Sequence, residues 1–120
     1  MKFNFKKKTY IYIGRFQPFH LGHLSLIKKV LKKNDQVALL VMDSYRVNKK
    51  NPFKFEAVKQ KIEEKLKKEF KGRYLIIKIP VVKTLVYGRK VGYKIKKVSL
   101  PKQIEKISAT SIRKKIFKKS

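Results

Sequence analysis

The stretch from Gly14 to His23, which reads Gly-Arg-Phe-Gln-Pro-Phe-His-Leu-Gly-His, constrains this chain more than any other. It follows an apolar run, Tyr10 to Ile13, and leads into a segment, Leu21 to Leu31, whose apolar residues recur at helical spacing. The pattern predicts a buried strand, a turn punctuated by glycine and proline, and then a helix. Both histidines of the sequence, His20 and His23, fall where that helix begins.

A helix start of this kind suits an anion, because the backbone N–H groups of the first turn have no partner within the helix and carry partial positive charge. His20 and His23 are three positions apart, so both imidazoles lie on one face of that turn and can donate to the same anion. The alternative is that the two histidines only cap the helix or lie on the surface. Gly22 would let a nucleotide approach the helix backbone closely, or would serve tight packing of helix on strand.

The rest of the chain predicts alternating strands and helices. Strands are expected at 9–14, 36–42 and 74–79, and a helix at 21–31 that ends at Asn34-Asp35. A second helix would begin at Pro52 and stop at Gly72, with one apolar stripe made of Phe55, Val58, Ile62, Leu66 and Phe70. The polar segment 43–51 would be a loop at the carboxyl end of the second strand, where doubly wound sheets bind ligands.

The last third of the chain is harder to interpret. Residues 81–92 give no clear pattern, and residues 93–98 alternate with period two, which predicts a strand at a sheet edge. A short final helix is expected from Ser111 to about Phe117, capped by Ser108 or Thr110. A strand, a helix and a strand at this spacing form a βαβ unit, and such crossovers are right-handed. The chain is therefore expected to form a Rossmann-like, doubly wound, mostly parallel α/β sheet. Its strand order would be near 3-2-1-4, with flanking helices, in a single domain over residues 1–120.

The composition is strongly basic, with 34 lysines and arginines against 7 acidic residues and a formal net charge of +27. Such a charge should attract polyanions and give nonspecific binding of nucleic acid. Because the excess is mostly lysine and is spread along the whole chain, it is better interpreted as a bias of composition than as a dedicated binding site. Cysteine is absent, and no apolar run reaches the roughly 20 residues of a membrane span. The start of the chain lacks the apolar core of a signal peptide, so we expect a cytoplasmic protein.

The motifs resemble a known superfamily. His20-Leu21-Gly22-His23 matches the HxGH signature of the nucleotidyltransferases, a superfamily that includes nicotinamide-mononucleotide adenylyltransferases and cytidylyltransferases. Gly14 to His20 is most similar to the archaeal-type nicotinamide-mononucleotide adenylyltransferases and to small proteins related to them. Asn51-Pro52-Phe53 resembles a turn of that subgroup, and Ile107 to Arg113 looks like the second signature, ISxTxxR. The three matches occur in the expected order.

This resemblance implies an enzyme and assigns its residues. His20, His23 and Arg113 would be catalytic, and phosphate or nucleotide would be bound by Gly14, Arg15, Phe16, Gly22, Ser108, Thr110 and Ser111. The acceptor would lie near Asn51, Phe53 and Tyr87, although Phe53 is equally well interpreted as a core residue. Mg²⁺ would be held mainly through the substrate's phosphates, with no direct side-chain ligand.

The implied reaction is nucleotidyl transfer, with AMP from ATP favoured over CMP from CTP. The acceptor would be a phosphorylated small molecule such as nicotinamide mononucleotide, and pyrophosphate would leave. Residues 81–92 are short and contain no tryptophan to stack on a nicotinamide ring, and Ala109 stands where relatives often have glycine or serine. Two alternatives stay open: a cytidylyltransferase acting on a phospho-alcohol, and a non-catalytic module that binds nucleotide or nucleic acid. The sequence also leaves open whether the chain forms a homo-oligomer.

Overall fold

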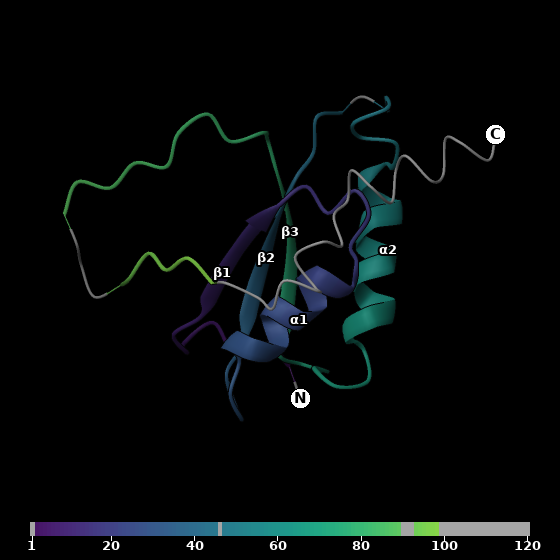
Figure 1. Cartoon of the computed structure of the whole chain (residues 1–120). Helices are drawn as coiled ribbons and strands as arrows, with labels where there is room; N and C mark the ends of the chain where they lie inside the picture. The colour runs from purple at the N-terminus through teal and green to yellow at the C-terminus, as the bar shows by residue number, and fades with distance from the viewer. Residues whose placement is uncertain (1, 46, 90–92, 99–120) are drawn as a thin grey trace.

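The computed structural model describes residues 2–45, 47–89 and 93–98 (Figure 1). Strands and helices alternate along these residues. The order is β1 (Tyr10–Gly14), α1 (Leu21–Val30), β2 (Val37–Met42), α2 (Phe55–Leu66) and β3 (Tyr74–Ile79).

The three strands form one parallel sheet in the order β1-β2-β3. Tyr12 lies beside Leu39, and Leu39 lies beside Ile76, which fixes the register across the sheet. Two right-handed crossovers that advance in the same direction place their helices on the same face. Figure 1 shows α1 and α2 on one side of the sheet. The described residues therefore confirm the 3-2-1 part of the predicted strand order and the Rossmann-like α/β arrangement.

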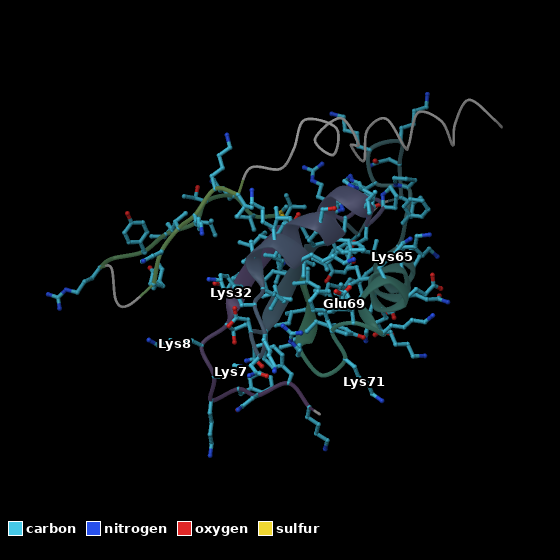
Figure 2. The ribbon with its side chains drawn as sticks, turned by 60° about the horizontal axis from the view of Figure 1, so that its bottom comes forward. Lys7, Lys8, Lys32, Lys65, Glu69 and Lys71 are labelled. Atoms are coloured by element: carbon cyan, nitrogen blue, oxygen red, sulfur yellow. The ribbon has the colours of Figure 1, made fainter. Side chains whose placement is uncertain are left out.

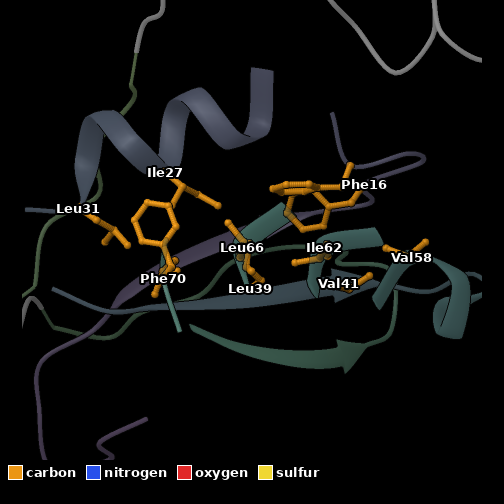
Figure 3. Packing of buried hydrophobic residues seen from close by; sticks show 11 residues of the cluster. Phe16, Ile27, Leu31, Leu39, Val41, Val58, Ile62, Leu66 and Phe70 are labelled. Carbon is orange, nitrogen blue, oxygen red and sulfur yellow. The ribbon is translucent and has the colours of Figure 1, made fainter. Parts of the chain in front are cut away.

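The core lies between this face of the sheet and the two helices (Figure 3). Leu39 and Val41 of β2 are covered by Ile27 of α1 and by Ile62 and Leu66 of α2, and none of these side chains is more than 1% exposed. The predicted apolar stripe of the second helix is confirmed at four positions, since Val58, Ile62, Leu66 and Phe70 are all buried.

The opposite face of the sheet is also apolar. Because side chains alternate along a strand, this face carries Ile11, Ile13, Ala38, Leu40, Met42, Leu75, Ile77 and Ile79. Neither α1 nor α2 lies on it, and Ile11 is 58% exposed and Ile77 38% exposed. The first strand was predicted to be buried on both faces, and this prediction is wrong at Ile11 within the described residues.

The ends of the helices differ from the predicted ones. α1 ends at Val30, because Leu31 already has extended backbone, and Asn34 takes a positive φ of 74° in the following turn. α2 begins at Phe55 and not at Pro52, with Lys54 as its N-cap. It ends at Leu66, and Gly72, with a φ of 75°, turns the chain toward β3 only after an intervening turn.

The segment 93–98 was predicted as a strand, and this prediction is wrong. The segment forms no strand and is largely exposed, with Ile95 at 69%. Its period-two pattern satisfies strand geometry, but a strand also requires a neighbouring edge with which to exchange hydrogen bonds. The predicted final helix, 111–117, lies outside the described residues.

Candidate functional site

Two phenylalanines anchor the turn between β1 and α1. Phe16 and Phe19 are 2% and 1% exposed, and both belong to the core cluster. Phe16 has a φ of 53°, in the left-handed region, which turns its ring back over the end of β1. A Cβ on Gly14 would lie 2.8 Å from Cζ of that ring, so glycine is needed there for packing. Arg15, which lies between Gly14 and Phe16 in sequence, is exposed.

His20 and His23 hold the start of α1 through one ring nitrogen each. Nδ1 of His20 accepts the backbone N–H of Gly22 at 3.0 Å, and Nδ1 of His23 accepts the backbone N–H of His20 at 3.0 Å. The two rings stack with their centroids 3.8 Å apart. The histidines therefore do cap the helix, and this capping uses only Nδ1 of each ring.

These hydrogen bonds determine where the ring protons are. A nitrogen that accepts a backbone N–H carries no proton, so each neutral imidazole carries its proton on Nε2. Burial lowers the pKa of His20, and burial together with the neighbouring His20 lowers the pKa of His23 to about 3. Both rings are thus uncharged at neutral pH, and each presents an Nε2–H donor.

The Phe16 and Phe19 rings both pack against the His23 ring. Phe19 stacks on His23 with the centroids 5.3 Å apart, and Phe16 meets the same ring edge-on at 4.9 Å. The Phe16 ring thus packs against His23, and its predicted role in binding nucleotide stays a prediction. Likewise, the Gly22 N–H is directed to the His20 ring, so at this position the imidazole replaces the backbone donor that the sequence predicts.

The loop that follows β2 meets this turn at Phe53. The Gln17 side chain donates from Nε2 to the Phe53 carbonyl at 2.9 Å, and its Oε1 accepts the Phe53 N–H at 2.9 Å. Asn51, another predicted acceptor residue, is half-buried in the adjoining turn, where its N–H bonds to Oδ1 of Asn48. Phe53 packs against the core cluster. Gln17 was not among the predicted site residues, although its position inside the Gly14–His23 motif could have indicated that it matters for the site.

An apolar hollow of about 300 Å³ lies between the turn and α2. One wall is made by Phe16, Pro18 and Phe19, and the other by Phe53, Ala57, Val58 and Lys61. The structure thus brings together the two histidines, the Gly14–Phe19 turn and the Asn51–Phe53 turn at the carboxyl ends of β1 and β2, as predicted for a doubly wound sheet.

Known proteins resemble this part of the chain. Residues 11–64 match the family model described as cytidylyltransferase-like. A nicotinamide-nucleotide adenylyltransferase of Thermoplasma volcanium is 37% identical over 68 residues, which cover 56% of this chain and 38% of the relative. This part of the chain is therefore similar to the cytidylyltransferase-like family.

Two further similar proteins are also adenylyltransferases by name. A phosphopantetheine adenylyltransferase of Malacoplasma penetrans is 41% identical, over 55% of this chain and 42% of the relative. Among solved structures, a bifunctional NMN adenylyltransferase/ADP ribose pyrophosphatase from Francisella tularensis, complexed with AMP and a manganese ion, has a TM-score of 0.56 and 36% identity. That match covers 61% of this chain and 22% of the other. The chain spans less than half the length of each of these relatives.

The remaining predicted site residues lie away from the turn or outside the described ranges. Tyr87 is 51% exposed and meets Tyr93 edge-on at 6.3 Å. It belongs to the segment after β3, which extends away from the sheet (Figures 1 and 2). Ser108, Thr110, Ser111 and Arg113 lie outside the described residues.

The described residues contain no group of three or more His, Cys, Asp or Glu side chains that would hold a metal ion. Lysines project from many parts of the surface, among them Lys7, Lys8, Lys32 and Lys71 (Figure 2). Within the described part of the chain, one ion pair is present, between Lys28 and Glu69 at 3.3 Å. Neither α1 nor α2 has the length and apolar character that a membrane-crossing helix needs.

Proposed function

We propose that this chain is a nucleotidyltransferase that transfers AMP from ATP to a phosphorylated small acceptor, with nicotinamide mononucleotide as the first candidate. An oxygen of the acceptor's phosphate attacks the α-phosphorus of ATP, a new phosphoanhydride bond forms, and pyrophosphate leaves. The relatives named for NMN adenylyl transfer support this choice. The phosphopantetheine adenylyltransferase similarity supports a second phosphorylated acceptor that must be tested beside it.

The histidine pair carries the proposal. Two neutral imidazoles, each with its proton held on Nε2 by a backbone hydrogen bond at Nδ1, are preorganised donors for charge that grows on the phosphoryl oxygens. Because the N–H groups of α1 hold the rings in place, little reorganisation is needed as the transition state forms. Because the pKa of each ring is lowered, both rings are neutral at pH 7, and each is proposed to bind phosphate through its one remaining N–H, at Nε2.

Arg113, Ser108, Thr110 and Ser111 are proposed to hold the leaving pyrophosphate, with Arg113 as a bidentate donor. Arg15 and the Gly14–Phe16 backbone are proposed to contact the nucleotide. Mg²⁺ is proposed to bind through the phosphates of the substrate. Mg²⁺ bound to the phosphates would neutralise part of their charge.

The test is pyrophosphate release in the presence of Mg²⁺. ATP is offered with nicotinamide mononucleotide or phosphopantetheine, and CTP with glycerol phosphate or phosphocholine. We expect release with ATP and one acceptor, and a loss of roughly 10²–10³-fold or more in kcat for His23→Ala, as for other oxyanion donors. Turnover of His23→Ala at the parent's rate would contradict the mechanism.

The net charge of +27 favours one competing function, a module that binds polyanions without catalysis. The same variants separate the two. A polyanion module would bind a labelled RNA equally well after His23→Ala and would release no pyrophosphate with any pair of substrates. The proposed enzyme instead loses turnover in His23→Ala while its salt-sensitive RNA binding stays unchanged.

A further inference from the structure

Gln17 joins two loops that approach from different parts of the chain. Its amide both donates to and accepts from the backbone of Phe53, at 2.9 Å in each case. Two neighbouring strands exchange a pair of N–H···O hydrogen bonds in the same way, but here one side chain provides both of them. Gln17 is only 4% exposed, so water does not replace these bonds easily.

The bonds that shape the 47–51 part of the loop are local. Asn48 Oδ1 accepts the N–H groups of Lys50 and Asn51 at 2.9 and 2.8 Å. The backbones of Asn48 and Asn51 also bond to each other. Such bonds give the loop its shape but do not fix its distance from the turn between β1 and α1. The contact between Gln17 and Phe53, across 36 positions of sequence, does fix that distance.

The residues beside Gln17 in sequence connect it to the histidines. Its neighbours in sequence, Phe16 and Pro18, line the hollow that Phe53 closes from the other side, and Phe16 contacts the His23 ring. A displacement of Phe53 therefore changes the position of the 51–53 turn relative to the His23 ring and to the hollow. The histidines themselves are held by backbone bonds that do not involve Gln17.

We infer that Gln17 is a positioning residue that sets where the acceptor binds relative to the phosphates of ATP. This inference rests on the proposed function, because it takes the Asn51–Phe53 turn to be part of the acceptor site. It separates two tasks within one motif: the histidines bind the phosphates of the nucleotide, and the glutamine between the two phenylalanines holds the acceptor loop beside them.

The main test compares Gln17→Met, which keeps the volume and removes both bonds, with the parent. We expect the acceptor KM to rise roughly 10- to 100-fold, as for comparable small misplacements, with ATP affinity by calorimetry changed less than about twofold. A merely structural role would lower stability and leave both constants of the folded fraction unchanged. Equal acceptor KM values in the two proteins would overturn the inference.

Gln36 supplies the matched control. It is a buried glutamine, 3% exposed, and it also bonds to distant backbone, namely Asn4 and Lys7 at the other end of the sheet. Gln36→Met should lower the melting temperature but leave the acceptor KM at the parent's value. A rise of acceptor KM in both variants would show that Gln17 acts only through general stability.

Gln17→Glu gives a pH-dependent rescue. A protonated carboxyl has one donor and one acceptor and reproduces both bonds to Phe53, whereas the ionised form loses the donor and repels the Phe53 carbonyl. Relative to the parent at each pH, the acceptor KM of Gln17→Glu should fall toward the parental value between about pH 8 and pH 5, since burial raises the pKa of a carboxyl. A ratio of KM values independent of pH would contradict the inference.

Hydrogen exchange separates failure of this inference from failure of the proposed function. The Phe53 amide should exchange at least about tenfold faster in Gln17→Met than in the parent or in Gln36→Met, with no substrate present. If the parent turns over no acceptor, the proposed function fails, and the acceptor role of Gln17 fails with it. Slow exchange of the Phe53 amide in Gln17→Met would overturn the inference even in an active enzyme.

Discussion

His20 and His23 each use Nδ1 to hold the start of α1, and Nε2 is the nitrogen that we propose contacts phosphate. Since Nδ1 of each ring accepts a backbone N–H, neither ring can take a second proton without losing that bond. The protonated form is therefore disfavoured by a lost hydrogen bond as well as by burial. The same two bonds that begin α1 thus also fix the tautomer that the proposed chemistry needs.

This arrangement makes stability depend on pH. The pKa of His23 is about 6.5 in an unfolded chain and about 3 in the folded protein. The unfolded state binds the extra proton between these values, so the contribution of His23 is complete above pH 6.5 and is lost as the pH falls toward 3. We expect the free energy of unfolding to fall by up to about 1.4 kcal/mol for each pH unit in this window.

Urea unfolding at a series of pH values measures this effect, with His23→Gln as the control. The amide of the variant does not titrate, so the difference in stability between parent and variant should shrink steadily below pH 6.5. A difference that stays constant from pH 7.5 to pH 4 would show that His23 is not held in its neutral form.

At the scale of elements, α2 joins the core to the loop that is proposed to bind the acceptor. Its buried side is the stripe Val58, Ile62 and Leu66, while its first residues follow the loop that Gln17 holds. At the other end of the sheet, the Arg73 side chain bonds to the carbonyls of Lys32 and Asp35 at 2.7 and 2.8 Å. These contacts connect the turn after α1 to the start of β3.

Removal of the Leu66 side chain should loosen this packing. Leu66 is fully buried, with 0% exposure, in the last turn of α2 (Figure 3). Leu66→Ala leaves a cavity and should lower the free energy of unfolding by about 2–5 kcal/mol. Its exposed neighbour Lys65 offers a matched substitution, and Lys65→Ala should change stability by less than about 0.5 kcal/mol. Equal effects of the two changes in urea unfolding would contradict the described orientation of α2.

At the scale of the whole molecule, charge opposes compactness. A formal net charge of +27 on 120 residues produces self-repulsion, and within the described residues a single ion pair offsets it. Much of the surface charge projects into solvent in Figure 2, where salt can screen it.

We therefore expect stability to rise with salt. Between about 0.01 M and 1 M NaCl the screening length falls from roughly 30 Å to 3 Å, and the free energy of unfolding should increase by about 1 kcal/mol or more. A variant with Lys7, Lys8 and Lys71 replaced by Gln should show a weaker dependence, because it carries less of the charge. A melting temperature that does not change with NaCl would argue that counterions already neutralise the surface.

The amino-acid sequence alone determined the parallel α/β fold, the β1–α1 turn and the histidine pair, because hydrophobic periodicity and short motifs are local properties. It predicted β3 to the residue and the α2 stripe at four positions. It failed at 93–98, since a strand depends on a partner edge that local alternation does not specify.

Tertiary structure decided the rest. That Nδ1 of His20 and of His23 caps α1 was shown only by the directions of two backbone N–H groups. Gln17 reads as an ordinary turn residue in sequence, and its role depends on a backbone 36 positions away. Contacts of this kind arise from how the strands are placed side by side, which no local pattern of residues records.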